Sequence, residues 1–175
     1  MLDFKEKFID FAQIQDIQAA IKRIETIQRI GSALTPPVEA AVCKSGLMTR
    51  QRVINFSDTF VQNISQNHIL LLARQVTYFH RIGLVHGDLC LSNIGVRGDK
   101  VFVFDWEPCL VLHRGVLRTT PYCIHPDDLT SRNLTVLTDR FAVLFLSVLS
   151  RYPHNDLFQL YERFKHRIVD FLESF

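Results

Sequence analysis

The sequence predicts an α+β fold, because stretches with helical periodicity alternate with short β-rich runs that are joined by turn residues. Apolar residues recur at steps of three and four, which is typical of helices, over 66–81, 139–151 and 155–175. Hairpins are predicted at 38–54 and 94–104. The chain of 175 residues is 47% hydrophobic, which is enough for the core of a single domain spanning 1–175.

The first 54 residues are predicted to form one helix followed by a β-hairpin. Apolar residues recur at helical spacing over 4–30, and Gly31 is a suitable residue to end a helix. The run Val38–Val42 is predicted to be a strand. Leu47–Ile54 is predicted to pair back with it, after a turn that contains Gly46.

Charge and cysteine content argue against several classes of protein. The net charge is only +2 and the signs are interspersed, which disfavours binding to nucleic acid or to an anionic membrane. The four cysteines lie far apart, so neither a disulfide framework nor a zinc site is indicated. The N-terminus lacks the features of a signal peptide, and no apolar run reaches the roughly 20 residues that cross a bilayer. We therefore expect a cytoplasmic protein with no nucleic-acid partner and no membrane span.

The most informative segment runs from His86 to Asn93 and reads HGDLCLSN. It is followed by the predicted hairpin, with strands at Ile94–Val96 and Val101–Phe104, and then by the tripeptide Asp-Trp-Glu that begins at Asp105. Because the hairpin returns the chain to its starting point, Asn93 and Asp105 are expected to lie side by side. Three oxygen-bearing side chains, those of Asp88, Asn93 and Asp105, would then converge.

These motifs resemble those of the protein-kinase-like superfamily, which includes protein kinases and phosphotransferases of the aminoglycoside, choline and lipopolysaccharide kinase type. The match is His-x-Asp-Leu-x-x-x-Asn, then a hairpin, then Asp-Trp-Glu where protein kinases carry Asp-Phe-Gly. In addition, 119–127 resembles the end of an activation segment, and 138–142 resembles the start of the central helix of the C-lobe. The resemblance implies a protein-kinase-like fold, with a reduced small lobe and hinge at 1–54 and a mainly helical C-lobe at 55–175.

By this resemblance, the chain is a phosphotransferase that moves the γ-phosphate of ATP to a hydroxyl of a protein or a small molecule, with Mg²⁺. Asp88 would accept the proton of the hydroxyl. Asn93 and Asp105 would bind Mg²⁺, which prefers hard oxygen ligands. His86 would support the metal-binding loop, and Asp139 would bind backbone amides of the catalytic loop.

The acceptor stays open, because the motifs point in two directions. HGD and Asp-Trp-Glu look more like the small-molecule phosphotransferases, whereas Thr120 to Asp127 looks more like a protein kinase. Cys90 stands where protein Ser/Thr kinases usually carry a lysine. Thr119 and Thr120 lie where phosphorylation would control such an enzyme.

The small lobe departs most from the family pattern, since no Gly-rich GxGxxG loop precedes the catalytic loop. The helix before the first hairpin would replace the regulatory helix, with Glu25 as its glutamate. The nucleotide-binding lysine would come from the preceding strand, where Lys5 is the candidate and Lys7 lies nearby. Helical periodicity instead favours both lysines as solvated charges on a helix.

The alternative to an active kinase is therefore a pseudokinase or regulatory binding module that acts through a protein partner. The same departure leaves open a second chain that completes the small lobe.

Overall fold

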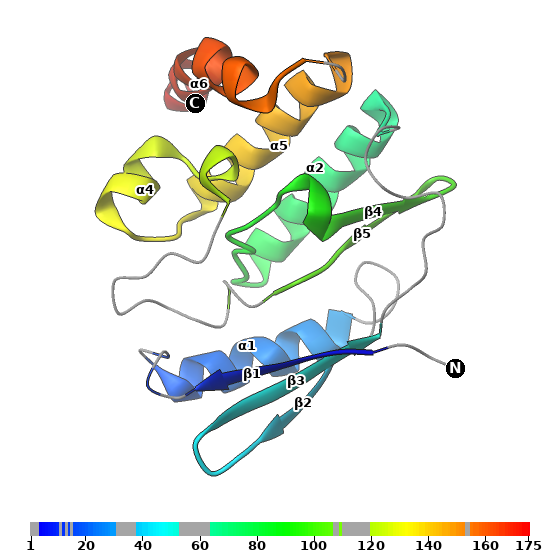
Figure 1. The fold of residues 1–175 in the computed structure, drawn as a ribbon, viewed down its shortest axis with the longest axis vertical. Coiled ribbons are helices and arrows are strands. Elements are labelled where there is room, and N and C mark those ends of the chain that lie inside the picture. Colours follow the sequence, from blue (N-terminus) through cyan, green and yellow to red (C-terminus); the bar gives the residue numbers. More distant parts are fainter. Residues whose placement is uncertain are drawn as a thin grey trace.

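The computed structural model describes residues 4–10, 12, 14, 16–30, 38–52, 64–106, 109, 120–152 and 155–175. Within them the chain is mixed α+β, as predicted. A three-stranded sheet with helix α1 lies at one end, and the hairpin β4–β5 with helices α2, α5 and α6 forms the rest (Figure 1). The elements are β1 (Phe4–Asp10), α1 (Ile17–Ile30), β2 (Val38–Val42), β3 (Gly46–Arg52), α2 (Gln66–Arg81), η3 (Leu91–Asn93), β4 (Ile94–Arg97), β5 (Lys100–Val103), η4 (Pro121–Cys123), α4 (Pro126–Ser131), α5 (Val136–Arg151) and α6 (Leu157–Glu173).

The N-terminal sheet corrects the prediction of a helix over 4–30. Its first part is strand β1, which pairs antiparallel with β3 from Phe4 opposite Arg52 to Asp10 opposite Gly46. The apolar residues within 4–11 have the spacing of a helix, but this segment forms a strand because it pairs with β3. That partner lies about 40 residues further along the chain, so local spacing does not reveal it. Helix α1 begins only after Asp16, whose carboxylate accepts the N–H of Ala19 at 2.9 Å.

The predicted hairpin is present as β2 and β3, and β1 extends it to a sheet in the order β1-β3-β2. The small N-terminal part therefore contains one helix and three strands rather than one helix and a hairpin. Ile9 and Leu47 are paired across β1 and β3 and are both buried, in the same core cluster as Ile24 and Ile27 of α1. The side chain of Phe8, which precedes Ile9 in β1 and therefore points to the opposite face, is 49% exposed. One face of the sheet is thus packed and the other faces outward.

The three long helices of the C-terminal part lie where the sequence predicted them. Ser65 caps α2, since its hydroxyl accepts the N–H of His68 while the His68 ring accepts the N–H of Ser65. Thr135 and Asp156 cap α5 and α6 through their side chains, which accept the N–H of Leu137 and of Gln159. Helix α5 carries Phe141 and Phe145 into a core shared with α6.

The second predicted hairpin is also present, as β4 and β5. The side chain of Gln75 on α2 donates to Val101 O at 2.9 Å, and His68 contacts Gly98 O at 2.9 Å. These contacts hold the hairpin alongside α2 (Figure 1).

Two short elements lie between β5 and α5, the 3₁₀ turn η4 and helix α4. Helix α4 forms because Pro126 occupies its first turn and the ring of His125 accepts the N–H of Asp127. The helical pattern over 155–175 predicted that Phe171 and Phe175 face inward, but they are 50% and 93% exposed.

No helix among the described residues is long and apolar enough to cross a membrane.

Thiol labelling tests the packing. Cys43 is exposed, whereas Cys90, Cys109 and Cys123 are buried. Burial raises the pKa of Cys109 to about 12 and that of Cys123 well above its usual range, so both thiols stay protonated and inert near neutral pH. We expect a thiol reagent to modify Cys43 alone in the native protein and all four cysteines after denaturation, as read by mass spectrometry. Fast native modification of Cys109 or Cys123 would contradict this packing.

Candidate functional site

The β4–β5 hairpin brings the chain after β5 back to the loop that precedes β4, as the sequence predicted. The backbone N–H of Phe104 donates to Asn93 O at 2.8 Å, so the residue before Asp105 is bonded to the residue that starts the hairpin. Asn93 and Asp105, 12 positions apart in the sequence, are thereby brought to the same end of β4–β5.

Asp88 and Asn93 are joined directly. The side-chain amide of Asn93 donates to Asp88 O at 2.9 Å and to Asp88 Oδ2 at 3.0 Å. The backbone N–H of Thr120 donates to the other carboxylate oxygen, Oδ1, at 2.7 Å. The carboxylate of Asp88 is therefore held in one orientation from two sides.

Asp139 fixes the backbone of the same loop. It is fully buried, and its carboxylate accepts the N–H of His86 and of Gly87, both at 2.8 Å. His80 Nε2 lies 3.0 Å from the same carboxylate. These are the amide contacts that the resemblance implied for Asp139. They hold Gly87 at φ 83°, a left-handed conformation that glycine adopts without steric cost.

His86 links the loop to the residue before Asp105. Its Nε2 contacts Phe104 O at 2.7 Å, and its Nδ1 accepts the N–H of Asp88 at 3.2 Å. This pattern assigns a neutral ring with the proton on Nε2. Trp106 packs edge-on against His86 and Phe79, with ring centroids 4.7 and 4.9 Å apart, and so lies beneath the loop in the core.

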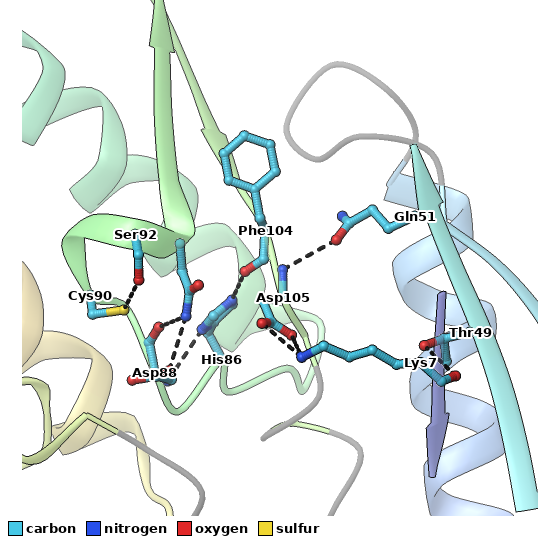
Figure 2. A network of polar contacts seen from close by, with 10 residues as sticks. Lys7, Thr49, Gln51, His86, Asp88, Cys90, Ser92, Phe104 and Asp105 are labelled. Atoms are coloured by element: carbon cyan, nitrogen blue, oxygen red, sulfur yellow. Dashed lines mark hydrogen bonds and ion pairs between the residues drawn. The ribbon is translucent and has the colours of Figure 1, made fainter. Parts of the chain in front are cut away.

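Lys7 reaches from β1 to Asp105. Its Nζ lies 2.6 and 2.8 Å from the two carboxylate oxygens, and the side chains are 28% and 22% exposed (Figure 2). Strand β3 adds a second contact, because Gln51 Oε1 accepts the backbone N–H of Asp105 at 3.3 Å. The N-terminal sheet therefore contacts Asp105 at both its side chain and its backbone.

Asp105 has an uncommon backbone conformation. Its φ is 59°, in the left-handed region that few residues other than glycine occupy. Such a conformation costs of order 1–3 kcal/mol and is found most often at functional sites. The contacts that Lys7 and Gln51 make with Asp105 stabilise the residue and so offset part of this cost.

Lys5 lies in β1 opposite Gln51, and its side chain is outside the described residues. The structure does not bring Glu25 into this cluster. Glu25 is 54% exposed on α1, where its carboxylate lies 3.9 Å from Arg29. Lys7, which the helical periodicity placed in solvent, is the lysine that reaches the site. Thr119 also lies outside the described residues.

The oxygen atoms of the cluster suit a hard cation. Among the described residues, no three His, Cys, Asp or Glu side chains are grouped to hold a metal ion. Mg²⁺, however, binds through one or two side chains and takes its other ligands from phosphates and water. Asp105 offers a partly exposed carboxylate, and Asn93 offers Oδ1, which accepts no hydrogen bond within the described part of the chain. The donor chemistry therefore fits Mg²⁺ with a bound phosphate.

A Lys7→Met variant should fold with nearly unchanged stability. The ion pair with Asp105 is partly exposed to solvent, and such pairs contribute at most about 1 kcal/mol. Urea unfolding is expected to give a free energy within about 1 kcal/mol of the unmodified protein. Lys165→Met, which removes the ion pair with Glu162 on α6, is the matched control. A much larger loss for Lys7→Met would mean that the pair holds the two parts of the molecule together.

Two contacts of the site had no local signal in the sequence. Gln51 and Thr120 lie 54 and 32 positions from the residues they bond. The contact of Lys7 had a signal that was missed: Lys7 lies two residues before buried Ile9, so a strand pattern would have placed both side chains on one face.

No protein-family model matches the sequence, and the search of curated proteins finds no similar one.

Proposed function

We propose that the chain is a kinase-like phosphotransferase that moves the γ-phosphate of ATP to a hydroxyl group with the help of Mg²⁺. The observation that supports this most is the pairing of Lys7 with Asp105, beside the linked pair Asp88 and Asn93. A lysine on a strand and a metal-binding aspartate beyond the catalytic loop are required together for phosphoryl transfer in kinases. No structural need of a packed core accounts for four such polar groups at one place.

The kinase-like fold belongs to the same proposal. The contacts of Asp139 with His86 N and Gly87 N are those expected of the C-lobe helix that supports a catalytic loop. The order strand with lysine, helix, hairpin and catalytic loop also agrees with the resemblance.

Each residue of the cluster has a distinct role in this proposal. Asn93 and Asp105 would hold Mg²⁺, which neutralises charge on the phosphates when bound. Lys7 would exchange its contact with Asp105 for one with a phosphate oxygen. Asp88 would orient the acceptor and take its proton, because its carboxylate is held in one orientation by Asn93 and Thr120.

The proposed transfer is balanced. The oxygen of the acceptor hydroxyl forms a bond to the γ-phosphorus, and the bond from that phosphorus to the bridging oxygen of ADP breaks. The hydroxyl proton passes to Asp88, and ADP leaves with the electron pair of the broken bond. The acceptor is a hydroxyl of a protein or of a small molecule.

The test is the loss of the γ-phosphate from labelled ATP on incubation with the purified chain, in Mg²⁺ and in excess EDTA. The reaction contains a mixture of proteins and small molecules that carry hydroxyl groups. Water can accept the phosphate if none of them does. We expect turnover with Mg²⁺ and none with EDTA. Nucleotide binding without any turnover would reject transfer.

The second candidate is a regulatory module that binds nucleotide or a protein partner without transfer. The position of Glu25 favours it, because a kinase needs its lysine paired with a helix glutamate, and here Glu25 contacts Arg29. A partner that completes the N-terminal part would be needed for activity in that case. Turnover of ATP that appears only when such a partner is added would indicate a kinase that needs its partner. No turnover with the partner would indicate a binding module.

A further inference from the structure

A cavity is lined by residues of α5 and α6 and by Tyr152. In Figure 1 these two helices lie at the end of the molecule away from the β1–β3 sheet. Its volume is about 310 Å³. The lining residues are mostly apolar, with one serine and two arginines: Leu144, Ser147, Val148, Arg151, Tyr152, Phe164, Arg167, Ile168 and Phe171. The candidate site around Asp105 shares none of them, so this cavity needs a separate explanation.

The apolar part of the cavity remains partly in water. Phe171 is 50% exposed and Tyr152 is 38% exposed, although both border the cavity. Tyr152 and Phe164 lie against each other with ring centroids 5.8 Å apart. An apolar group bound here would remove aromatic surface from solvent, which is favourable.

Within the part of the chain that the structure describes, no acidic side chain balances the charge of the two arginines. No Asp or Glu lines the cavity, and no ion pair involves Arg151 or Arg167 within the described ranges. Arg167 lies over the Phe164 ring at 5.9 Å. In contrast, Lys165 on the same helix is paired with Glu162 at 2.7 Å. The positive charges of Arg151 and Arg167 at the cavity are therefore unpaired within the described residues, whereas that of Lys165 nearby is paired.

We propose that this cavity binds a small amphipathic carboxylate, with its apolar chain on Val148, Phe164 and Ile168 and its carboxylate between Arg151 and Arg167. The volume is at the lower end of the roughly 300–1,000 Å³ of small-molecule sites, which suits one short acyl or aryl chain better than a peptide helix. The planar guanidinium group matches a carboxylate with two parallel hydrogen bonds. The proposal does not depend on phosphotransfer.

The test uses three probes with the same eight-carbon body: octanoate, 1-octanol and octylammonium. Binding is followed by NMR on ¹³C-labelled methyl groups of Leu, Val and Ile. Octanoate is expected to shift the methyl signals of Leu144, Val148 and Ile168 in a saturable way. Octanol should bind about tenfold more weakly, equivalent to about 1.4 kcal/mol, and octylammonium more weakly still.

Variants separate the charge from the apolar contact. The double change Arg151→Gln with Arg167→Gln is expected to weaken octanoate about tenfold and to leave octanol unchanged. Arg140→Gln, on the exposed side of α5 and outside the cavity, is the matched control and should have no effect. Since these arginines are exposed, the variants are expected to fold, which circular dichroism checks.

Three results would overturn the proposal. The first is equal affinity for octanoate and octanol. The second is unchanged octanoate binding in the double variant. The third is binding to phosphatidylserine vesicles without binding of free octanoate, which would assign the arginines to a membrane surface instead.

Discussion

Replacing Asp139 with Ala is expected to lower the free energy of unfolding by about 2–6 kcal/mol. The side chain is fully buried and accepts the backbone N–H groups of His86 and Gly87. Without it, two buried donors lose their partner, and each such loss costs about 1–3 kcal/mol. Since domains of this kind are stable by only about 5–15 kcal/mol, the variant would lie close to unfolding at 37 °C.

Urea unfolding followed by circular dichroism measures this loss. Asp156→Ala is the control, because it also removes a carboxylate that accepts a backbone N–H but does so at the exposed N-terminus of α6. A helix cap of that kind is worth about 1 kcal/mol. Equal effects of the two changes would show that the contacts of Asp139 do not stabilise the loop at His86 and Gly87.

Replacing Asp88 with Ala is expected to slow phosphoryl transfer by about 10²–10⁴-fold, the usual contribution of a general base. Asn93 and Thr120 hold the carboxylate of Asp88 in one orientation, and in the proposed reaction this carboxylate receives the proton. Because it is not one of the proposed Mg²⁺ ligands, the affinity for ATP with Mg²⁺ should change little. The effect should therefore fall on the rate at saturating ATP and not on binding.

The measurement is the single-turnover rate of transfer with ATP and Mg²⁺ in excess. Asp127→Ala is the matched control, because that carboxylate is 80% exposed on α4 and lies outside the cluster. We expect it to retain full activity. Full activity of Asp88→Ala itself would remove Asp88 from the reaction, whatever the role of Asp105.

Short-range geometry explains which parts of the site could be predicted. Asp88, Asn93 and Asp105 lie within 18 residues of one another, and the hairpin between Asn93 and Asp105 shows clearly in the sequence. Their convergence therefore followed from local turn chemistry. The roles of His86 and Asp139 came from the resemblance, and the backbone-amide contacts that it implied for Asp139 are present.

Long-range pairing explains what was missed. Strand β1 is held by β3, and its own apolar spacing also fits a helix, so the prediction placed Lys7 in solvent. In a strand, Lys7 instead shares a face with buried Ile9 and reaches Asp105. Gln51 lies in the predicted strand Leu47–Ile54, and no neighbouring residue in the sequence indicates its bond to Asp105 N. Tertiary partners of this kind cannot be deduced from periodicity.

The most direct test of the proposed nucleotide site is the thermal stability of the purified protein with ATP and Mg²⁺, with ATP alone and with Mg²⁺ alone. At about 100 times its dissociation constant, a ligand stabilises the native state by about 2.7 kcal/mol. For a chain of this size that is a rise of roughly 5–10 °C in the melting temperature.

The proposal predicts this rise with ATP and Mg²⁺ together, its loss in Asp105→Ala and its retention in Asp99→Ala. Asp99 is an exposed carboxylate in the turn of the same hairpin, and so controls for the general effect of removing a charge there. No rise in the unmodified protein, or an equal rise in Asp105→Ala, would contradict nucleotide binding at this cluster.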